Sequence, residues 1–384
     1  MIEATIEMIS DQDILSLIER RVGESRSLEF KRELPGPKDD DVKEFLADVT
    51  SLANTGGGDV MFGIEEVGGA AAALTPIAAE RADAALLRLE SLLKDGIEPR
   101  LPGTRLRWIS LGADGGVILV RVAASLAGPH RVKFRNWGKF FGRNSRGKFE
   151  LDTFELRQAF TSSDQLPARV RGLHEIAVST SFGGLLPFRQ IDEPSAVATI
   201  VPLGLLREAR SFDINFENAL LPHYTGRGFE HLNTLEGVVV YSPADIDQQR
   251  PYEMVGGYAL THWSGRIDAV WSVGGERELQ PGRTDRLVWA KNFEGGLTDA
   301  GTSTMAKLNA LGVDGPWAVL VTVTGLKGYS LVLDAYRTSA PAWRDQAALP
   351  ELVVEHISAA ALEPLFKAFW LLFGQLRPAT QSRS

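Results

Sequence analysis

The chain has 384 residues, a formal net charge of −8, and 44% hydrophobic and 23% charged residues. This length exceeds one comfortable hydrophobic core and predicts two domains, and the ordinary composition excludes a largely disordered chain. The sequence has no cysteine, which excludes disulfides, thiolate zinc sites and cysteine nucleophiles.

The first 160 residues alternate between helical and strand patterns. Apolar residues spaced three and four apart predict helices, and apolar runs next to glycine or proline predict strands. The predicted helices cover residues 11–21, 41–54, 77–94 and 152–160. The predicted strands cover 27–34, 59–66, 105–111, 117–123 and a hairpin within 131–148. The pattern indicates a mixed α/β (α+β) fold.

The remainder of the chain has a different pattern. Residues 161–200 are rich in Ser, Gly and Pro and predict a connection followed by a first strand. Apolar runs then predict a strand-rich region with helices near 298–311 and 356–373. We therefore expect one domain at 1–162 and a strand-rich α+β domain at 163–384, which would serve as a sensor or targeting module. Its scattered histidines show no metal-ligand spacing and are expected to be structural.

Acidic residues around the first strand are the most informative feature. Glu24 precedes that strand and Glu29 lies in it, while Glu65 or Glu66 ends the strand after the glycine turn. Three carboxylates that converge in this way form a hard oxygen site suited to Mg²⁺ or Mn²⁺. The alternative is that they are solvated charges, with Glu29 paired to Lys31 or to an arginine.

A basic segment follows at residues 131–148. It contains seven cations and no acidic residue: Arg131, Lys133, Arg135, Lys139, Arg143, Arg146 and Lys148. Cations of this kind bind phosphates, so these residues, together with Lys31, are candidate nucleic-acid contacts, with Arg143 and Arg146 the first choices. The interleaved aromatics are expected to pack inward, and His130 is expected to be structural.

The glycine run at 56–58 does not resemble a nucleotide-binding loop. No Gly-Lys-Ser/Thr follows it, and it enters a strand and not a helix. We expect a structural role, in which the glycines permit the turn that brings the acidic strand beside Glu24 and Glu29.

Three blocks in order resemble the Schlafen AlbA-type domain. They are ESRSLEFK at 24–31, LANTGGGDVMFGIEE at 52–66 and PHRVKFRNWGKFFGRNSRGKFELDTFELRQAF at 129–160. In vertebrate Schlafens this domain is a metal-dependent endoribonuclease that acts on transfer and ribosomal RNA. The resemblance implies metal-binding and catalytic roles for Glu24 and Glu29, and for Glu66 or Glu65 in place of the family's aspartate.

The leading hypothesis is therefore a divalent-metal-dependent endonuclease acting on transfer-RNA-like substrates, as a stress or phage-defence effector. The competing hypothesis is a non-catalytic nucleic-acid-binding transcriptional regulator whose second domain senses an unknown ligand or protein. A nucleotide-binding protein ranks last. The acidic N-terminus and the lack of a long apolar stretch predict a cytoplasmic protein without a membrane partner, and homo-oligomerisation is left open.

Overall fold

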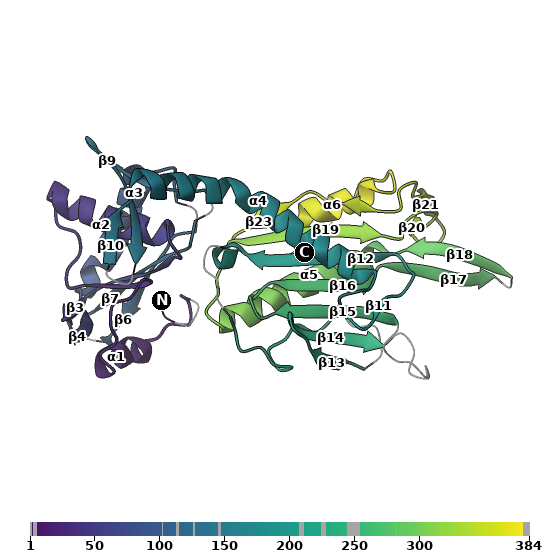
Figure 1. The fold of residues 1–384 in the computed structure, drawn as a ribbon, viewed down its shortest axis with the longest axis horizontal. Coiled ribbons are helices and arrows are strands. Elements are labelled where there is room, and N and C mark those ends of the chain that lie inside the picture. The colour runs from purple at the N-terminus through teal and green to yellow at the C-terminus, as the bar shows by residue number, and fades with distance from the viewer. Residues whose placement is uncertain are drawn as a thin grey trace. The chain divides into compact units, whose positions relative to one another are not determined.

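The computed structural model describes residues 2, 6–101, 103–112, 115–125, 127–144, 147–206, 211–223, 228–243, 254–280 and 282–378. The chain forms two compact units (Figure 1). Unit 1 comprises Met1–Pro167, Leu203–Ala209 and Asn309–Pro316, and unit 2 comprises Ala168–Pro202, Arg210–Leu308 and Trp317–Ser384. Both units contain helices and strands, which confirms the mixed α/β class predicted from the sequence. None of the helices in the described ranges is long and apolar enough to span a membrane.

Unit 1 contains the predicted helices and strands with small shifts. Its helices are α1 (Asp11–Glu19), α2 (Asp39–Ala53), α3 (Ala82–Gly96) and the start of α4 (Thr153–Ser181), with a short 3-10 turn at Ala79–Arg81. Its strands are β1 (Leu28–Lys31), β2 (Gly58–Phe62), β3 (Ile64–Val67), β4 (Ala70–Leu74), β5 (Ile97–Glu98), β6 (Arg105–Ser110), β7 (Gly116–Val122), β8 (Arg131–Phe134), β9 (Trp137–Asn144) and β10 (Gly147–Glu150).

The described strands of unit 1 form two four-stranded sheets and a hairpin. One sheet has the order β1-β2-β7-β6, with β1 and β2 parallel, and the other has the order β10-β9-β8-β5. Side chains of β2 alternate between two apolar cores: Val60 and Phe62 pack with α2, and Met61 packs with α1. The first sheet is thus covered on both faces, which fixes its strands relative to α2.

The strand predicted at 59–66 is wrong as a single element. Gly63 has φ +99°, a left-handed conformation that L side chains rarely adopt, and it separates β2 from β3. β3 pairs with β4 in a separate hairpin, so Glu65 and Glu66 do not belong to the sheet that carries Glu29.

The helix predicted at 152–160 is much longer in the structure. Asp152 and Glu155 form the expected reciprocal capping contacts, with 2.8 and 2.9 Å hydrogen bonds. α4 then continues to Ser181 through the stretch predicted as a connection, with Pro167 inside it. Leu166, Val170 and Ala177 are buried, so one apolar stripe holds the second half of the helix in place.

Unit 2 is strand-rich, as predicted. Its strands are β11 (Arg189–Gln190), β12 (Ser195–Pro202), β13 (Glu230–Asn233), β14 (Gly237–Pro243), β15 (Met254–His262), β16 (Ile267–Ser272), β17 (Gly274–Gln280), β18 (Arg283–Val288), β19 (Trp317–Thr324), β20 (Ser330–Val332), β21 (Thr338–Pro341), β22 (Ala347–Ala348) and β23 (Leu352–Val354). Its helices are the rest of α4, α5 (Ala290–Ala310) and α6 (Glu363–Leu371).

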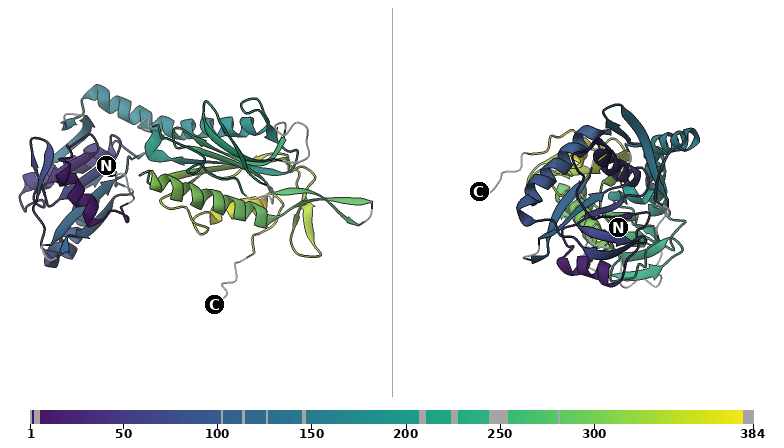
Figure 2. Two further views of the ribbon diagram at one scale, coloured as in Figure 1. Left: turned by 90° about the horizontal axis from the view of Figure 1, so that it is seen from below. Right: turned by 90° about the vertical axis from the view of Figure 1, so that its left-hand side faces the viewer.

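Helices cover both faces of the large sheet in unit 2. The described strands of this sheet follow the order β13-β14-β15-β16-β12-β19-β22, with β11 and β23 attached to β15 and β19. Figure 2 shows α4 and α5 on opposite sides of it. His174 of α4 contacts Thr199, whereas Gly296 of α5 lies against Trp271, whose side chain is on the other face. Both faces are therefore buried, and polar residues between α4 and the sheet need internal partners.

Candidate functional site

A polar pocket of about 290 Å³ lies in unit 1 where the sequence predicted an acidic site. Segments far apart in the chain contribute to it: the loop before β1, β1 itself, α2, the β3–β4 turn, and the ends of β9 and β10. Its lining residues are Glu24, Ser25, Glu29, Glu44, Asp48, Gly69, Arg143, Gly147 and Lys148. We call it the acidic pocket.

The glycine turn after α2 positions the walls of this pocket. Gly57 and Gly58 both have positive φ, and a Cβ at Gly58 would lie 2.5 Å from the carbonyl oxygen of Ser27. Asn54 ends α2, and its Nδ2 donates to the carbonyl oxygens of His130 (2.8 Å) and Phe141 (2.9 Å). The turn therefore allows β2 to pair with β1 and ties α2 to β9, as the structural role predicted for these glycines requires.

Glu29 lies at the centre of an ion-pair network. Its Oε1 is 2.7 Å from Lys31 Nζ, and its Oε2 accepts a hydrogen bond from Arg143 Nη2. Burial by itself would raise the pKa of Glu29, but the hydrogen bonds and charges of Lys31 and Arg143 outweigh burial and lower it. Glu29 is therefore held as a carboxylate, and the predicted pairing with Lys31 is present.

Asp48 is a member of the pocket that sequence reasoning missed. It is 1% exposed on α2, with Oδ1 2.8 Å from Lys148 Nζ and Oδ2 3.3 Å from Lys31 Nζ. Burial raises the pKa of Asp48 against the opposing charges of Lys148 and Lys31. The signal in the sequence was a carboxylate inside the apolar run FLADVTSLA, four residues after Glu44 and hence on the same helical face.

Glu24 has a different environment from Glu29. Its Oε1 accepts a 2.9 Å hydrogen bond from the backbone N–H of Phe30. Burial raises the pKa of Glu24, the Phe30 hydrogen bond opposes this, and the negative charges of Glu29 and Glu66 raise it further. Burial raises the pKa of both Glu24 and Asp48, but Glu24 is only partly buried whereas Asp48 is 1% exposed, so Glu24 is the one of the two better placed to exchange a proton with a ligand.

Glu65 and Glu66, the two candidates for the third carboxylate, have different partners in the structure. Glu66 is exposed on β3, contacts the backbone N–H of Gly69 at the pocket wall, and lies close enough to Glu24 to affect its pKa. Glu65 pairs with Arg32 at 3.1 Å instead. Of the two, Glu66 is the one that can act on the acidic pocket.

The cations of the basic segment are compensated by acidic residues from other elements. Arg131 and Lys133 pair with Glu98, and Lys139 pairs with Glu150. Arg135 similarly pairs with Asp39 at 2.9 Å. These are exposed or half-exposed pairs, which contribute little to stability and can be exchanged for phosphate contacts. Arg146 lies outside the described residues.

Arg143 is the exception within this segment. Its side chain is 2% exposed, Nε donates to the carbonyl oxygen of Ser25 at 3.2 Å, and Nη2 donates to Glu29. Its Nη1 is buried and has no hydrogen-bond partner within the described part of the chain. A buried guanidinium donor without a partner is costly, so this nitrogen is a ready position for an anion oxygen.

The aromatic residues and His130 have structural roles, as predicted. Phe141 is buried in the core of α2, and Trp137 packs against that core with a 5.4 Å ring separation from Phe141. His130 is fully buried, with Nδ1 2.6 Å from the carbonyl oxygen of Pro99 and Nε2 2.5 Å from Ser125 Oγ. Neither group is presented for base stacking or proton transfer.

The donor set, as arranged, does not fit a resident divalent ion. Across the described ranges no group of three His, Cys, Asp or Glu side chains is placed to hold a metal. Both oxygens of Glu29 and both oxygens of Asp48 face a cationic side chain, so an ion would have to displace Lys31 or Arg143. The Mg²⁺ or Mn²⁺ expected from the resemblance stays a prediction.

Comparison with known families gives one specific match. Residues 24–152, about a third of the chain, match the family model described as Schlafen, AlbA_2, so unit 1 contains a Schlafen AlbA-type domain. This domain type indicates a nucleic-acid-related function. No curated protein matches the chain.

Two solved structures are similar to part of the chain. A crystal structure of a protein from Corynebacterium diphtheriae shares 15% identity over 38% of this chain and 30% of that one, with a TM-score of 0.26. The second is the solution structure of the N-terminal domain of a Nitrosomonas europaea protein, described as a putative ATP-dependent DNA helicase RecG-related protein. It shares 17% identity over 36% of this chain and 89% of that one, with a TM-score of 0.28. This chain thus spans less than a third of the length of the first.

Proposed function

We propose that the Schlafen AlbA-type domain of unit 1 is an endonuclease that acts on RNA, with transfer-RNA-like substrates favoured, and that the acidic pocket is its active site. The observation that carries the proposal is the unpartnered, buried Nη1 of Arg143, which lines the same pocket as Glu24. A donor for a phosphate oxygen and a carboxylate with a raised pKa are thus within one small polar cavity.

The roles follow from these environments. Arg143 and Lys148 would hold the non-bridging oxygens of the scissile phosphate, because both are cations at the pocket wall. Glu24 would accept the proton of the attacking hydroxyl as the new P–O bond forms. The P–O bond to the leaving ribose oxygen then breaks, and that oxygen takes a proton from solvent. Glu29 would position Arg143 through its ion pair and would not itself exchange a proton, because its pKa is lowered.

No step is assigned to a divalent ion, because the carboxylates already face cations. These ion pairs between Glu29 and the cations Lys31 and Arg143 also favour the second candidate function, a nucleic-acid-binding regulator without catalysis. The two candidates predict the same affinity for RNA but differ in whether the RNA is cut.

The test uses the full chain and purified transfer RNA, with Mn²⁺ in one series and a chelator in the other. We expect cleavage by the wild type, loss of cleavage in Glu24→Gln and Glu29→Ala, and full activity in Glu90→Gln. Glu90 is an exposed residue of α3 outside the pocket lining and serves as the matched control. RNA binding without cleavage in both series would sink the nuclease proposal and support the regulator. Cleavage only with Mn²⁺ would show that an ion enters the pocket by displacing one of its cations.

A further inference from the structure

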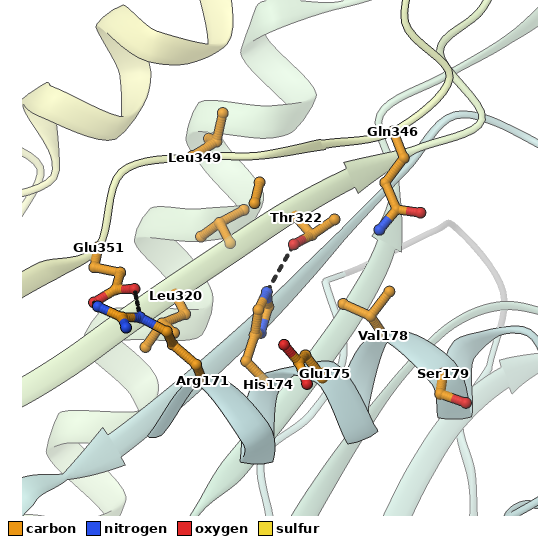
Figure 3. Close-up of a pocket in the computed structure, with 12 residues that line it drawn as sticks. Arg171, His174, Glu175, Val178, Ser179, Leu320, Thr322, Gln346, Leu349 and Glu351 are labelled. Carbon is orange, nitrogen blue, oxygen red and sulfur yellow. Dashed lines mark hydrogen bonds and ion pairs between the residues drawn. The ribbon is translucent and has the colours of Figure 1, made fainter. Parts of the chain in front are cut away.

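Unit 2 contains a pocket that is larger than the acidic pocket of unit 1. It has a volume of about 470 Å³, within the range of small-molecule sites, and lies between α4 and the edge of the large sheet (Figure 3). One face of α4 supplies Arg171, His174, Glu175, Val178 and Ser179. The sheet side supplies Leu320, Val321, Thr322, Gln346, Ala348, Leu349 and Glu351.

Hydrogen bonds to both ring nitrogens fix the tautomer of His174 at the wall of this pocket. Its Nδ1 is 2.9 Å from Thr199 Oγ1, and its Nε2 is 2.8 Å from Thr322 Oγ1, the contact drawn in Figure 3. Thr199 donates its own proton to Asp268 at 2.9 Å, so Thr199 can only accept from His174. His174 therefore carries its proton on Nδ1, and its Nε2 accepts the proton of Thr322. Burial lowers the pKa of His174, which keeps the ring neutral.

This chain of hydrogen bonds determines what the pocket offers to a ligand. Because the proton of Thr322 is directed to His174, the Thr322 hydroxyl can only accept a further hydrogen bond. Arg171, the one cation of the lining, is engaged by Glu351 through two contacts. Glu175 has no ion-pair partner in the described part of the chain. The lining thus has an excess negative charge and acceptors at Glu175 and Thr322, beside Gln346 and Ser179, which can both donate and accept.

The walls beside these acceptors are apolar. Val178, Leu320 and Leu349 are all buried and line the cavity. A ligand that fits has an apolar body and a cationic group that can donate several hydrogen bonds. An anionic ligand would meet two carboxylates, and its only cationic partner would first have to leave Glu351.

We propose that this pocket is a binding site for a small organic cation, an amine or amidine with an apolar body, whose donors are received by Glu175 and Thr322. The site belongs to unit 2 and does not depend on the function proposed for unit 1. The proposal assigns the unknown ligand of the second domain to one chemical class, organic cations.

Three isosteric probes separate charge from shape. Benzamidine is cationic, benzamide is neutral and benzoate is anionic, with nearly the same volume. Isothermal titration of the full chain should show benzamidine binding, weaker binding of benzamide and none of benzoate at millimolar concentration. The opposite order, or no binding of benzamidine, would overturn the proposal.

Variants locate the binding. Glu175 is exposed, so Glu175→Gln should fold normally and weaken benzamidine roughly tenfold through loss of a charge-assisted hydrogen bond. Ala348→Trp places a large ring in the pocket from an exposed position of β22 and should abolish binding. Glu355→Gln, an exposed carboxylate outside the lining, should leave the affinity unchanged. Benzamidine binding that survives both pocket variants would place the ligand elsewhere and refute the assignment.

Discussion

The acidic pocket of unit 1 and the pocket of unit 2 that His174 lines (the His174 pocket) both lie where a helix packs on strands, and both contain buried polar groups, but they present different groups to a ligand. Among the described residues of the acidic pocket, carboxylates and cations form ion pairs, and the donor left without a hydrogen-bond partner is Nη1 of Arg143. Oδ2 of Asp48 has no hydrogen-bond partner either, but it lies 3.3 Å from Lys31 Nζ. In unit 2, each proton is directed inward from Thr322 through His174 and Thr199 to Asp268, so acceptors are left over. The residue that remains unpaired, more than the net count of charges, indicates the ligand.

The two networks also differ in how they meet solvent. Asp268 is 3% exposed and receives hydrogen bonds from Thr199 and His262 as well as an ion pair from Arg266. Burial alone would raise the pKa of Asp268, but these partners lower it. Glu29 has two charged partners among the described residues and lies at the wall of an open pocket. We therefore expect the unit 2 network to stabilise the fold, and the ion pairs of the unit 1 network to rearrange when a ligand enters the pocket.

The largest predicted effect tests this difference in stability. Asp268→Asn leaves the buried Arg266 without its counter-charge and should lower the free energy of unfolding by about 3–5 kcal/mol. Glu29→Gln also removes the counter-charge of Arg143, but it should cost less, about 1–2 kcal/mol, because both residues line an open pocket that water can enter and Lys31 keeps Asp48 as a partner. Urea titration of the full chain followed by tryptophan fluorescence measures both. An equal or larger loss in Glu29→Gln would break the comparison.

The next effect concerns the cations of the basic segment. Arg143→Met should weaken RNA binding about tenfold or more, because it removes the unpartnered donor of the pocket. Lys139→Met is the matched control, since Lys139 is half-exposed and paired with Glu150. Fluorescence anisotropy over a salt series should show a smaller salt slope, by about 0.7 per lost contact, in Arg143→Met only. Equal losses in both variants would indicate a diffuse basic surface in place of a specific phosphate position.

A smaller effect is the pH dependence of stability that comes from His174. Burial lowers the pKa of His174 in the folded protein below its ordinary value of 6.5, so the unfolded chain takes up the proton first as the pH falls. The stability that neutral His174 contributes is complete above pH 6.5 and is lost as the pH falls toward the lowered pKa, by up to about 1.4 kcal/mol per pH unit. The stability difference between wild type and His174→Gln should therefore shrink below pH 6.5. A difference that is constant from pH 7.5 to 5 would contradict the buried neutral state.

Local patterns in the sequence predicted the parts of the acidic pocket that depend on neighbouring residues. Glu24 precedes one short strand and Glu29 lies in it, so the proximity of the two carboxylates follows from their spacing, and the glycines after α2 require a tight turn. Asp48 could not be found in this way, because it is held by Lys148, 100 positions away. An aspartate in an apolar stripe is ordinarily expected to point to solvent, and only the tertiary fold supplies its counter-charge.

The predictions for the strand at 59–66 and the helix at 152–160 were wrong in extent, because local composition does not reveal how these segments pack. The run DVMFGIEE was predicted as one strand, because its sequence alone does not indicate that Gly63 takes a positive φ and that a separate hairpin begins at Ile64. The second half of α4 lies in the stretch 161–200, whose Ser, Gly and Pro residues suggested a connection. Its buried residues recur at helical spacing, but that stripe is stable only against the sheet of unit 2. Tertiary contacts decided both cases.

The smallest predicted effect separates Glu66 from Glu65, which sequence reasoning could not do. The charge of Glu66 raises the pKa of Glu24, so Glu66→Gln should lower that pKa and move the acid limb of RNA cleavage to lower pH. Glu65→Gln should leave the limb in place, since Glu65 pairs with Arg32 and is not among the charges that shift Glu24. Cleavage rates from pH 4.5 to 8 measure the shift. A limb that moves in Glu65→Gln would mean that Glu65 is the third carboxylate, and complete loss of activity in Glu66→Gln would make Glu66 a catalytic group in its own right.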